Sequence, residues 1–283
     1  MKTLSFSFIL ALLTFGSFAT SGQAKNYTDL EEALRNPDKV EVLILADKKL
    51  TTFPTEIFEL KNLKYLDLSD NRLTALPENI GSLTELFYLD LSGNTISSLP
   101  EDITRLAALN NLYLEYGVPT DLGRDFERLS ALPVLRVLEV TGKNISELPA
   151  SIGGMKNLEY LELLSSTVEE LPAEFAQLKN LEILYINDDP KFDLKKNIGV
   201  LSQLPELSEL HLEGDHFTQI PAEIIQLQAI QYLYLRDNDL QSLPVELSEL
   251  KNLKYVDVSS NSIPNVMLEQ YRNELAPTVK VMF

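Results

Sequence analysis

The residues of this sequence that could do metal or acid–base chemistry are few. Its 283 residues include two histidines, His211 and His216, and no cysteine. Without cysteine the chain has no disulfide, thiolate metal ligand or cysteine nucleophile. Glu209, His211 and Glu213 alternate along the chain, and alternate residues of a strand share a face, so this trio could hold a metal ion. Solvated strand residues are the simpler interpretation, and we favour it.

Other patterns that carry chemistry are incomplete. Asp188 and Asp189 precede Pro190, but the spaced acidic loop and glycine turn of a calcium site do not follow. A Ser-His-Asp set around His211 would lack the sequence of a nucleophile elbow, and no glycine-rich phosphate loop is present. We therefore predict that the chain is no enzyme, needs no cofactor and has no catalytic or metal site.

Composition narrows the class of partner. Lys and Arg total 24 against 42 Asp and Glu, which gives a formal net charge of −18. Nucleic acid and anionic membrane surfaces are bound through basic footprints, so we expect neither as a partner. Hydrophobic residues make up 45% and charged residues 23% of the chain, as in globular domains rather than disordered segments.

Residues 1–24 match the three-part pattern of a secretory signal peptide. Lys2 provides a positive start, an apolar run covers residues 6–18, and a stretch of small residues follows. The run is shorter than the ~20 residues of a membrane-spanning helix, although an uncleaved anchor is the alternative. We expect cleavage after Ala24, or else after Ala19, and a secreted, periplasmic or cell-surface protein that is not inserted in a membrane.

The rest of the chain consists of repeats. Equivalent first positions recur at Val40, Leu63, Leu86, Leu109, Leu135, Leu158, Leu181, Leu207, Ile230 and Leu253. The units are 23 residues long, except that the units at 109–134 and 181–206 have 26. Positions one, four and six are aliphatic in all ten units, which chance does not produce. Because no unit can bury its apolar side alone, stacked units must share one core, and this core replaces the missing disulfides as the source of stability.

Each unit should contain a strand, a turn and a return segment. Positions three to seven alternate as a short parallel strand does, with positions four and six facing inward. In most units a proline follows an apolar residue of the return segment, and an apolar anchor comes three residues later. The prolines are Pro54, Pro77, Pro100, Pro149, Pro172, Pro221 and Pro244, and the anchors are Ile57, Ile80, Ile103, Ile152, Phe175, Ile224 and Leu247.

The repeated string LxxLxLxxNxLxxLPxxIxxL resembles the leucine-rich repeat over residues 40–263, in the bacterial form with 23-residue LPxxI units. The resemblance implies an α/β solenoid, a horseshoe with a parallel β-sheet on its concave side and short helical or irregular segments on its convex side. It also implies that the concave face binds other proteins. In the family an asparagine at position nine bonds to the backbone of the turn. Only Asn71, Asn94, Asn238 and Asn261 fill that position here, so the middle of the ladder should be less regular than its ends.

Caps are expected at both ends of the repeats, a helical one at 25–39 and a helix plus a strand at 264–283. Thr28 and Glu31 form a capping-box pattern, which predicts a helix over residues 29–35. The C-terminal pattern consists of Leu268, Tyr271 and Leu275 on one helical face, Pro277 as a stop, and Val279, Val281 and Phe283 as a last strand. Such caps without cysteine resemble those of bacterial repeat proteins, so we expect a bacterial origin.

The two 26-residue units lack the Leu-Pro turn and align with each other at an offset of 72 residues. Apolar residues recur in both at helical spacing, Leu122, Phe126 and Leu129 in one and Leu194, Ile198 and Leu201 in the other. We predict a longer convex helix in each, beginning near Asp121 and Asp193. A change of curvature is our interpretation of these units, and the alternative is that loops 115–120 and 187–191 contact a partner.

Strand positions three and five should face the concave side, away from the aliphatic core. Eight of the eleven tyrosines fall there, interleaved with carboxylates. Ten strands ~4.8 Å apart span roughly 43 Å, enough for a protein-sized footprint, and tyrosine gives rigid contact area. The candidate partner-binding residues are Tyr65, Asp67, Tyr88, Asp90, Tyr113, Glu139, Tyr160, Glu162, Tyr185, His211, Tyr232, Tyr234, Tyr255 and Asp257.

This surface predicts a secreted or envelope-exposed scaffold that binds a partner protein, and the carboxylates favour a basic partner. A glycan stacked on the tyrosines is the alternative ligand, and a structural spacer without a ligand is a third possibility. Two simpler explanations coexist with these: tyrosine suits packing across strands, and the acidic residues keep the protein soluble.

Overall fold

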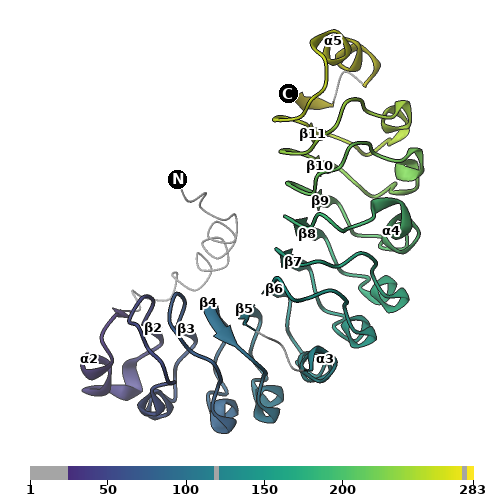
Figure 1. Ribbon diagram of the computed structural model, residues 1–283. Coiled ribbons are helices and arrows are strands. Elements are labelled where there is room, and N and C mark those ends of the chain that lie inside the picture. Colours follow the sequence, from purple (N-terminus) through teal and green to yellow (C-terminus); the bar gives the residue numbers. More distant parts are fainter. Residues whose placement is uncertain (1–24, 118–120, 276–278) are drawn as a thin grey trace.

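The computed structural model describes residues 25–117, 121–275 and 279–283. The proposed signal peptide, the end of loop 115–120 and Pro277 lie outside these ranges. The repeats stack into an arc in which the strands line the inner, concave side and the helices lie along the outer, convex side (Figure 1). The horseshoe solenoid predicted from the repeats is therefore confirmed.

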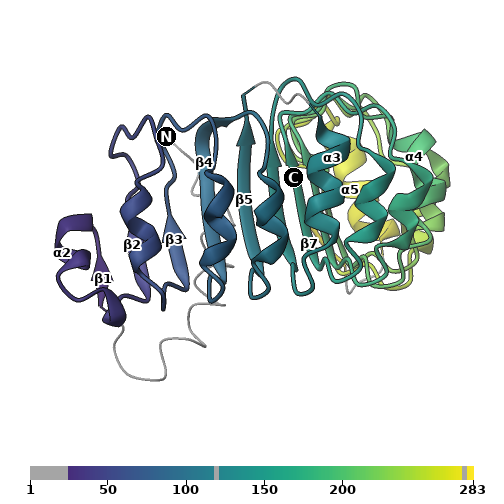
Figure 2. The ribbon, with the colours of Figure 1, turned by 90° about the horizontal axis from the view of Figure 1, so that it is seen from below.

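A single parallel sheet connects twelve strands in their order along the chain. Figure 2 shows the N-terminal strands side by side across the arc. The strands are β1 (Asn26–Tyr27), β2 (Val42–Ile44), β3 (Tyr65–Asp67), β4 (Tyr88–Ile96), β5 (Asn111–Tyr116), β6 (Val137–Thr141), β7 (Tyr160–Leu164), β8 (Ile183–Asn187), β9 (Glu209–His211), β10 (Tyr232–Tyr234), β11 (Tyr255–Asp257) and β12 (Lys280–Met282). Between β2 and β11 the register pairs equal repeat positions, as where Leu138 lies opposite Leu161, so positions three to five form rows across the sheet. The register shifts at the end of β4, where Ile96 lies opposite Tyr116 of β5.

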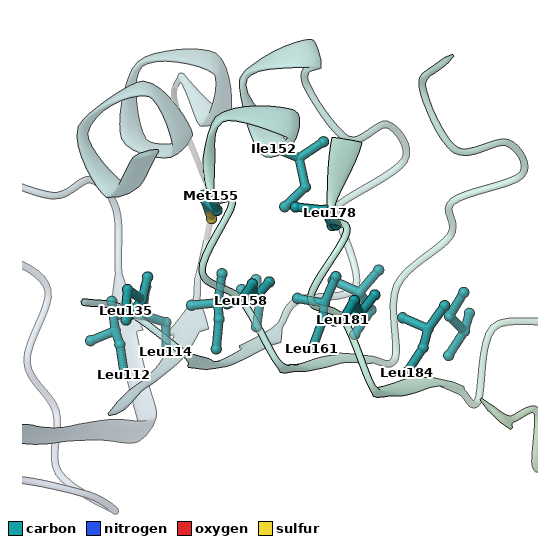
Figure 3. Close-up of a cluster of buried hydrophobic side chains, with 14 of the residues drawn as sticks. Leu112, Leu114, Leu135, Ile152, Met155, Leu158, Leu161, Leu178, Leu181 and Leu184 are labelled. Carbon is teal, nitrogen blue, oxygen red and sulfur yellow. The ribbon is translucent and has the colours of Figure 1, made fainter. Parts of the chain in front are cut away.

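The aliphatic rows form the core. All thirty residues at positions one, four and six are at most 4% exposed. Figure 3 shows how Leu135, Leu158 and Leu181, at position one, follow one another from coil to coil. Burying one such side chain contributes about 1.5–3 kcal/mol, and the contribution is available only when the neighbouring coil is folded. The predicted column is confirmed.

Short 3-10 helices line most of the convex side, and each begins directly after a repeat proline. They are η2 (Thr55–Glu59), η3 (Glu78–Ser82), η4 (Glu101–Arg105), η5 (Ala150–Gly154), η6 (Ala173–Gln177), η7 (Ala222–Gln226) and η8 (Val245–Glu249). The seven anchors predicted three residues after the prolines are at most 1% exposed. Proline fixes the backbone at the entry of each turn, and the anchor ties the turn to the core. No helix of the described residues is long and apolar enough to span a bilayer.

The 26-residue units carry the longer convex helices that the sequence predicts, α3 (Leu122–Ser130) and α4 (Leu194–Leu201). Asp121 accepts a hydrogen bond from the backbone N–H of Arg124, and Asp193 accepts one from that of Lys196. Both acids therefore cap the helix that follows, as an acidic side chain at this position should.

A third helix, at the C-terminus, contacts the preceding coil in the same way as α3 and α4 do. The sequence did not predict this equivalence. The backbone N–H groups of Leu99, Leu171 and Leu243, which are 72 residues apart, each donate to a side chain of the next long helix. The acceptors are Asp125 of α3, Asn197 of α4 and the Tyr271 hydroxyl of α5 (Asn265–Glu274), respectively. The 72-residue period thus extends into the C-terminal cap, where the hydroxyl of Tyr271 also donates to the Leu243 carbonyl.

The N-terminal cap differs from the prediction in one respect. Helix α2 (Leu30–Leu34) is capped by Asp29, whose carboxylate accepts from the backbone N–H of Glu32, so the capping box predicted at Thr28 and Glu31 is wrong. An aspartate caps at least as well as a threonine, and it moves the helix start by one residue. The strand β1 pairs with β2, and the turn η1 (Pro37–Lys39) leads into the first repeat.

The position-nine asparagines form the ladder that the family resemblance implies. Asn71 illustrates it: its Oδ1 accepts from the backbone N–H groups of Lys48 and Leu50, and its Nδ2 donates to the carbonyls of Leu45 and Leu68. Because the amide both donates and accepts, it links two coils at the point where the strand turns. Strands β5 to β8 have five or six residues against three in β9 to β11, so the middle of the sheet is more extended than its C-terminal part.

In the units that begin at Leu181 and Leu207, an aspartate occupies position nine in place of this asparagine. Asp189 is completely buried, and its carboxylate accepts from Ser166 and from the backbone N–H groups of Val168 and Lys191. Asp215 accepts from the backbone N–H of Asp189, at 2.8 Å, and no other described residue provides a hydrogen bond to its Oδ2. Burial, followed by the nearby carboxylates, raises the pKa of Asp215 to about 8, against a weaker opposing effect of the Asp189 N–H.

Asp215→Asn should stabilise the protein in a pH-dependent way. The folded protein holds the Asp215 proton up to about pH 8, whereas the unfolded chain releases it near pH 4. The folded state therefore binds more protons between these values, and wild-type stability falls as the pH rises through this window. The asparagine cannot ionise and supplies an N–H donor, so we expect a gain on the order of 5 kcal/mol at pH 8 and almost none at pH 4.

Chemical denaturation of both proteins across pH 4–8 measures this difference. Asp189→Asn is the matched control: the carboxylate of Asp189 only accepts hydrogen bonds, so this variant should gain no stability at any pH. An equal gain in both variants, or a gain for Asp215→Asn that does not change with pH, would contradict the assignment.

Candidate functional site

Positions three and five of β3 to β11 lie on the concave side of the sheet, opposite the aliphatic column. The register sets Tyr65 beside Tyr88 and Asp67 beside Asp90, and it continues in this way through the central strands. The candidate residues therefore come together as two rows that run across the strands. They form one continuous face, which we call the concave face.

Aromatic rings on the concave face form two ladders. In the N-terminal ladder Tyr65 stacks on Tyr88 with ring centroids 4.1 Å apart, and Tyr88 contacts Tyr113 at 5.1 Å. The C-terminal ladder consists of Tyr160, Tyr185, His211, Tyr234 and Tyr255. Tyrosine thus packs across the strands, as one of the interpretations of the sequence predicted.

The ladders bury half of the candidate residues. Seven are at most 9% exposed: Tyr88, Tyr113, Glu139, Tyr160, Glu162, Tyr185 and His211. The other seven are half-buried: Tyr65, Asp67, Asp90, Tyr232, Tyr234, Tyr255 and Asp257. The side chains point away from the aliphatic core but pack into a second cluster, in which the more accessible groups lie toward the two ends of the face.

Aspartates at position five hold the turn that follows the strand. The Oδ1 of Asp90 accepts from the backbone N–H and the hydroxyl of Ser92, at 2.9 and 2.6 Å. The same arrangement recurs in Asp67 with Ser69 and in Asp257 with Ser259. Tyr88 donates to Asp90 at 3.3 Å, and burial raises the pKa of Asp90 to about 6 although the contacts with Ser92 oppose the rise. These carboxylates are therefore held in fixed positions before any partner binds.

His211 lies at the centre of the C-terminal ladder. Its ring lies between those of Tyr185 and Tyr234, with centroids at 3.6 and 3.9 Å. Glu209 lies 2.8 Å from Nε2, and Glu213 lies 3.2 Å from Nδ1. The two carboxylates lie at different nitrogens of the ring, so the trio does not converge on one ion, and the described residues contain no group of three such side chains that could hold a metal.

The loops that could have contacted a partner have structural contacts of their own. Asp189 occupies position nine and accepts from the backbone N–H of Val168 in the preceding coil, and Asn187 accepts from the backbone N–H of Glu213 at 3.0 Å. In the fourth unit Glu115 accepts from the backbone N–H of Gly93. Gly93 has φ +64°, and an added Cβ would lie 2.6 Å from the carboxylate of Asp70, so this turn requires glycine. The calcium pattern at Asp188 and Asp189 therefore marks a turn between coils.

Asn111 is a concave residue that the sequence analysis left out of the candidate set. It occupies position three of β5 between Tyr88 and Val137, and it is completely buried. Among the described residues, neither its amide oxygen nor its amide nitrogen makes a hydrogen bond of good geometry, and the same holds for the hydroxyl of Tyr113, although burial raises the pKa of that hydroxyl and the Asn111 amide lies close enough to oppose the rise. The sequence did contain one sign of this residue: at position three, where most units carry an aromatic or aliphatic residue, the fourth unit carries an amide.

Comparisons with known proteins agree on the fold. The profile described as a leucine-rich repeat region matches residues 40–132 and 120–215, and a second leucine-rich repeat profile matches 205–263. No curated protein sequence matches the chain.

Solved structures of similar proteins include bacterial proteins and the ectodomain of a receptor kinase of Arabidopsis thaliana. A leucine-rich repeat protein of Leptospira interrogans is 28% identical with a TM-score of 0.56, over 93% of this chain and 82% of that one. A TDR receptor is 26% identical with a TM-score of 0.60, over 87% of this chain and 43% of that one. Internalin C2 of Listeria monocytogenes, at 24% identity and a TM-score of 0.52, covers 80% of this chain and 83% of that one and shares the fold.

His211→Ala should destabilise the protein by about 2 kcal/mol, because it removes two ring contacts and leaves two carboxylates facing a cavity. His216→Ala is the matched control: the His216 side chain is 71% exposed, and we expect a change within about 0.5 kcal/mol. Thermal and urea unfolding measure both. If the two variants unfold alike, His211 does not support the ladder.

Proposed function

The chain belongs to the leucine-rich repeat family, and we propose that it is a secreted or envelope-exposed scaffold whose concave face binds a partner protein. Solenoids of this kind use extended concave surfaces for binding and are generally not enzymes. The observation that carries the proposal is the face of tyrosines and carboxylates on β3 to β11, which ring contacts and hydrogen bonds hold in place. Little side-chain entropy remains to be lost on binding, which favours affinity.

Charge supports a basic partner. The net charge is −18, and acidic side chains recur along position five of the strands. A surface of this sign attracts a positive partner and repels an acidic one, mainly by changing the rate of encounter. The half-buried groups toward the ends of the face, such as Asp67 and Tyr232, offer the accessible contact area.

The ladder geometry disfavours the glycan alternative. A sugar ring stacks on the face of an aromatic ring, whereas in this protein the faces of Tyr185, His211 and Tyr234 cover one another. The concave face therefore presents ring edges, hydroxyls and carboxylates. These groups suit a protein surface that offers hydrogen-bond donors and positive charge.

Export to the envelope or the medium is part of the proposal and rests on the pattern of residues 1–24. Cell fractionation and N-terminal sequencing of the protein from its native cells test it. We expect a mature chain that begins at Lys25. A cytoplasmic protein that retains Met1 would contradict it.

A concave variant should lose its partner while remaining folded. We choose Asp67→Asn, Asp90→Asn and Tyr232→Ala together, since these side chains are half-buried and Tyr232 lies outside both ladders. Purified protein carrying a photo-cross-linker is incubated with native cells, and the captured protein is identified and then expressed for binding measurements. We expect an affinity loss of at least about tenfold, because removing three contact groups from an interface together typically costs more than about 1.4 kcal/mol.

The matched control carries the same number of substitutions on the convex side, Glu56→Gln, Glu78→Gln and Val245→Ala. All three residues are exposed and lie in η2, η3 and η8. Affinity of the control should stay within about twofold of wild type. Loss in the control and retention in the concave variant would move the site to the convex side, and saturable binding of an oligosaccharide by wild type would favour the glycan alternative.

A further inference from the structure

The aromatic ladders of the concave face are interrupted at β6. Glu139 occupies position five of that strand, and no ring contact joins Tyr113 to Tyr160 in the part of the chain that the structure describes. In register, Glu139 lies opposite Glu162 of β7, with Tyr113 on one side of the pair and Tyr185 on the other. Two carboxylates thus stand side by side between aromatic residues.

The strand next to this pair carries polar atoms that lack partners. Asn111 is 0% exposed and Tyr113 is 3% exposed, and within the described part of the chain both amide atoms of Asn111 and the hydroxyl of Tyr113 lack a hydrogen bond of good geometry. Both side chains are on the concave side of β5, and Tyr113 is the register neighbour of Glu139. Buried polar groups are nearly always hydrogen-bonded in folded proteins, so two such residues beside each other indicate a ligand that completes them.

Burial raises the pKa of Tyr113, and it outweighs the opposite effect of the neighbouring Asn111 amide. The hydroxyl therefore keeps its proton at neutral pH, and its oxygen remains available as an acceptor. Together with the amide oxygen of Asn111 and the carboxylates of Glu139 and Glu162, it gives a set of oxygen acceptors spread over three neighbouring strands. We call these four residues the β5–β7 patch.

We infer that the β5–β7 patch receives an arginine side chain of the partner protein; this deepens the proposed function and rests on it. A guanidinium presents five N–H donors in one plane and pairs with carboxylates in a two-pronged geometry. The patch offers acceptors for that fork in the carboxylates of Glu139 and Glu162, which lie side by side in register. A lysine ammonium is a compact, strongly hydrated charge with three donors and matches the spread-out acceptors less well.

Short peptides test this inference on the purified protein without knowledge of the partner. The probes are acetyl-Ala-Arg-Ala-amide and its lysine and citrulline versions, titrated against protein with ¹³C-labelled tyrosine and followed by NMR. We expect saturable shifts with the arginine peptide and at least tenfold weaker binding of the citrulline peptide, which has the same shape without the charge. The lysine peptide should lie between them. Equal binding of the arginine and citrulline peptides, or no saturable shift with arginine, would overturn the inference.

Two variants place the binding in the patch. Glu139→Gln should weaken the arginine peptide at least fivefold, and Glu182→Gln, which makes the same charge change at an exposed residue outside the two rows, less than twofold. Tyr113→Phe removes only the hydroxyl and should weaken binding about threefold. If Glu139→Gln fails to fold, the affinity of Tyr113→Phe for the arginine peptide is the test. A folded variant of either kind that binds this peptide as tightly as wild type would contradict the assignment to the β5–β7 patch.

The two proposals fail separately. If the arginine peptide binds as expected but no concave variant affects capture of the partner protein, the arginine site is supported and the scaffold function is contradicted. If concave variants abolish capture but the protein binds the arginine and citrulline peptides equally, the scaffold function is supported and the arginine site is contradicted.

Discussion

The apolar contact between one coil and the next is the interaction on which the rest of this protein depends. A single unit has a three-residue strand and one turn, too little to bury its own leucines. Stacked, the rows at positions one, four and six become almost completely buried. This contact also sets the register, because a leucine at position four can be buried only if it meets the same position of its neighbour. The concave rows, the asparagine ladder and the convex turns all follow from that register.

Much of this could be predicted from the sequence because the periodic signal is local. Aliphatic residues at fixed spacing identified the strands, and a proline with its anchor identified each convex turn. Asp121 and Asp193 identified the starts of α3 and α4. At the N-terminus the same kind of reasoning chose Thr28 over Asp29, since two good capping residues stand next to each other and only the packing of α2 separates them.

Contacts between coils were harder to predict. Tyr271 satisfies the backbone N–H of Leu243 as Asn197 satisfies that of Leu171, yet a tyrosine, an asparagine and an aspartate share no sequence pattern. For the concave face the sequence showed which side the tyrosines are on. It did not show that their rings cover one another, because ring orientation depends on neighbours in adjacent strands. The amide of Asn111, which makes no hydrogen bond of good geometry with the described residues, escaped notice for the same reason.

The sheet therefore has two packed sides of different chemistry. One is an aliphatic core that any stable solenoid of this family needs, and the other is a cluster of tyrosines, a histidine and carboxylates. Stacked rings and carboxylates bonded to serine and tyrosine hydroxyls leave this second side rigid and negative. Such a face is suited to binding a positive surface with little rearrangement.

Hydroxyl-radical footprinting of the protein alone and with its cross-linked partner shows whether the partner lies on the concave face. Oxidation of aromatic side chains reports which face the partner covers. We expect Tyr65, Tyr232 and Tyr255 to become protected, while Phe58, on the convex side in η2, remains as reactive as before. Protection of Phe58 with unchanged oxidation of the three tyrosines would contradict binding at the concave face.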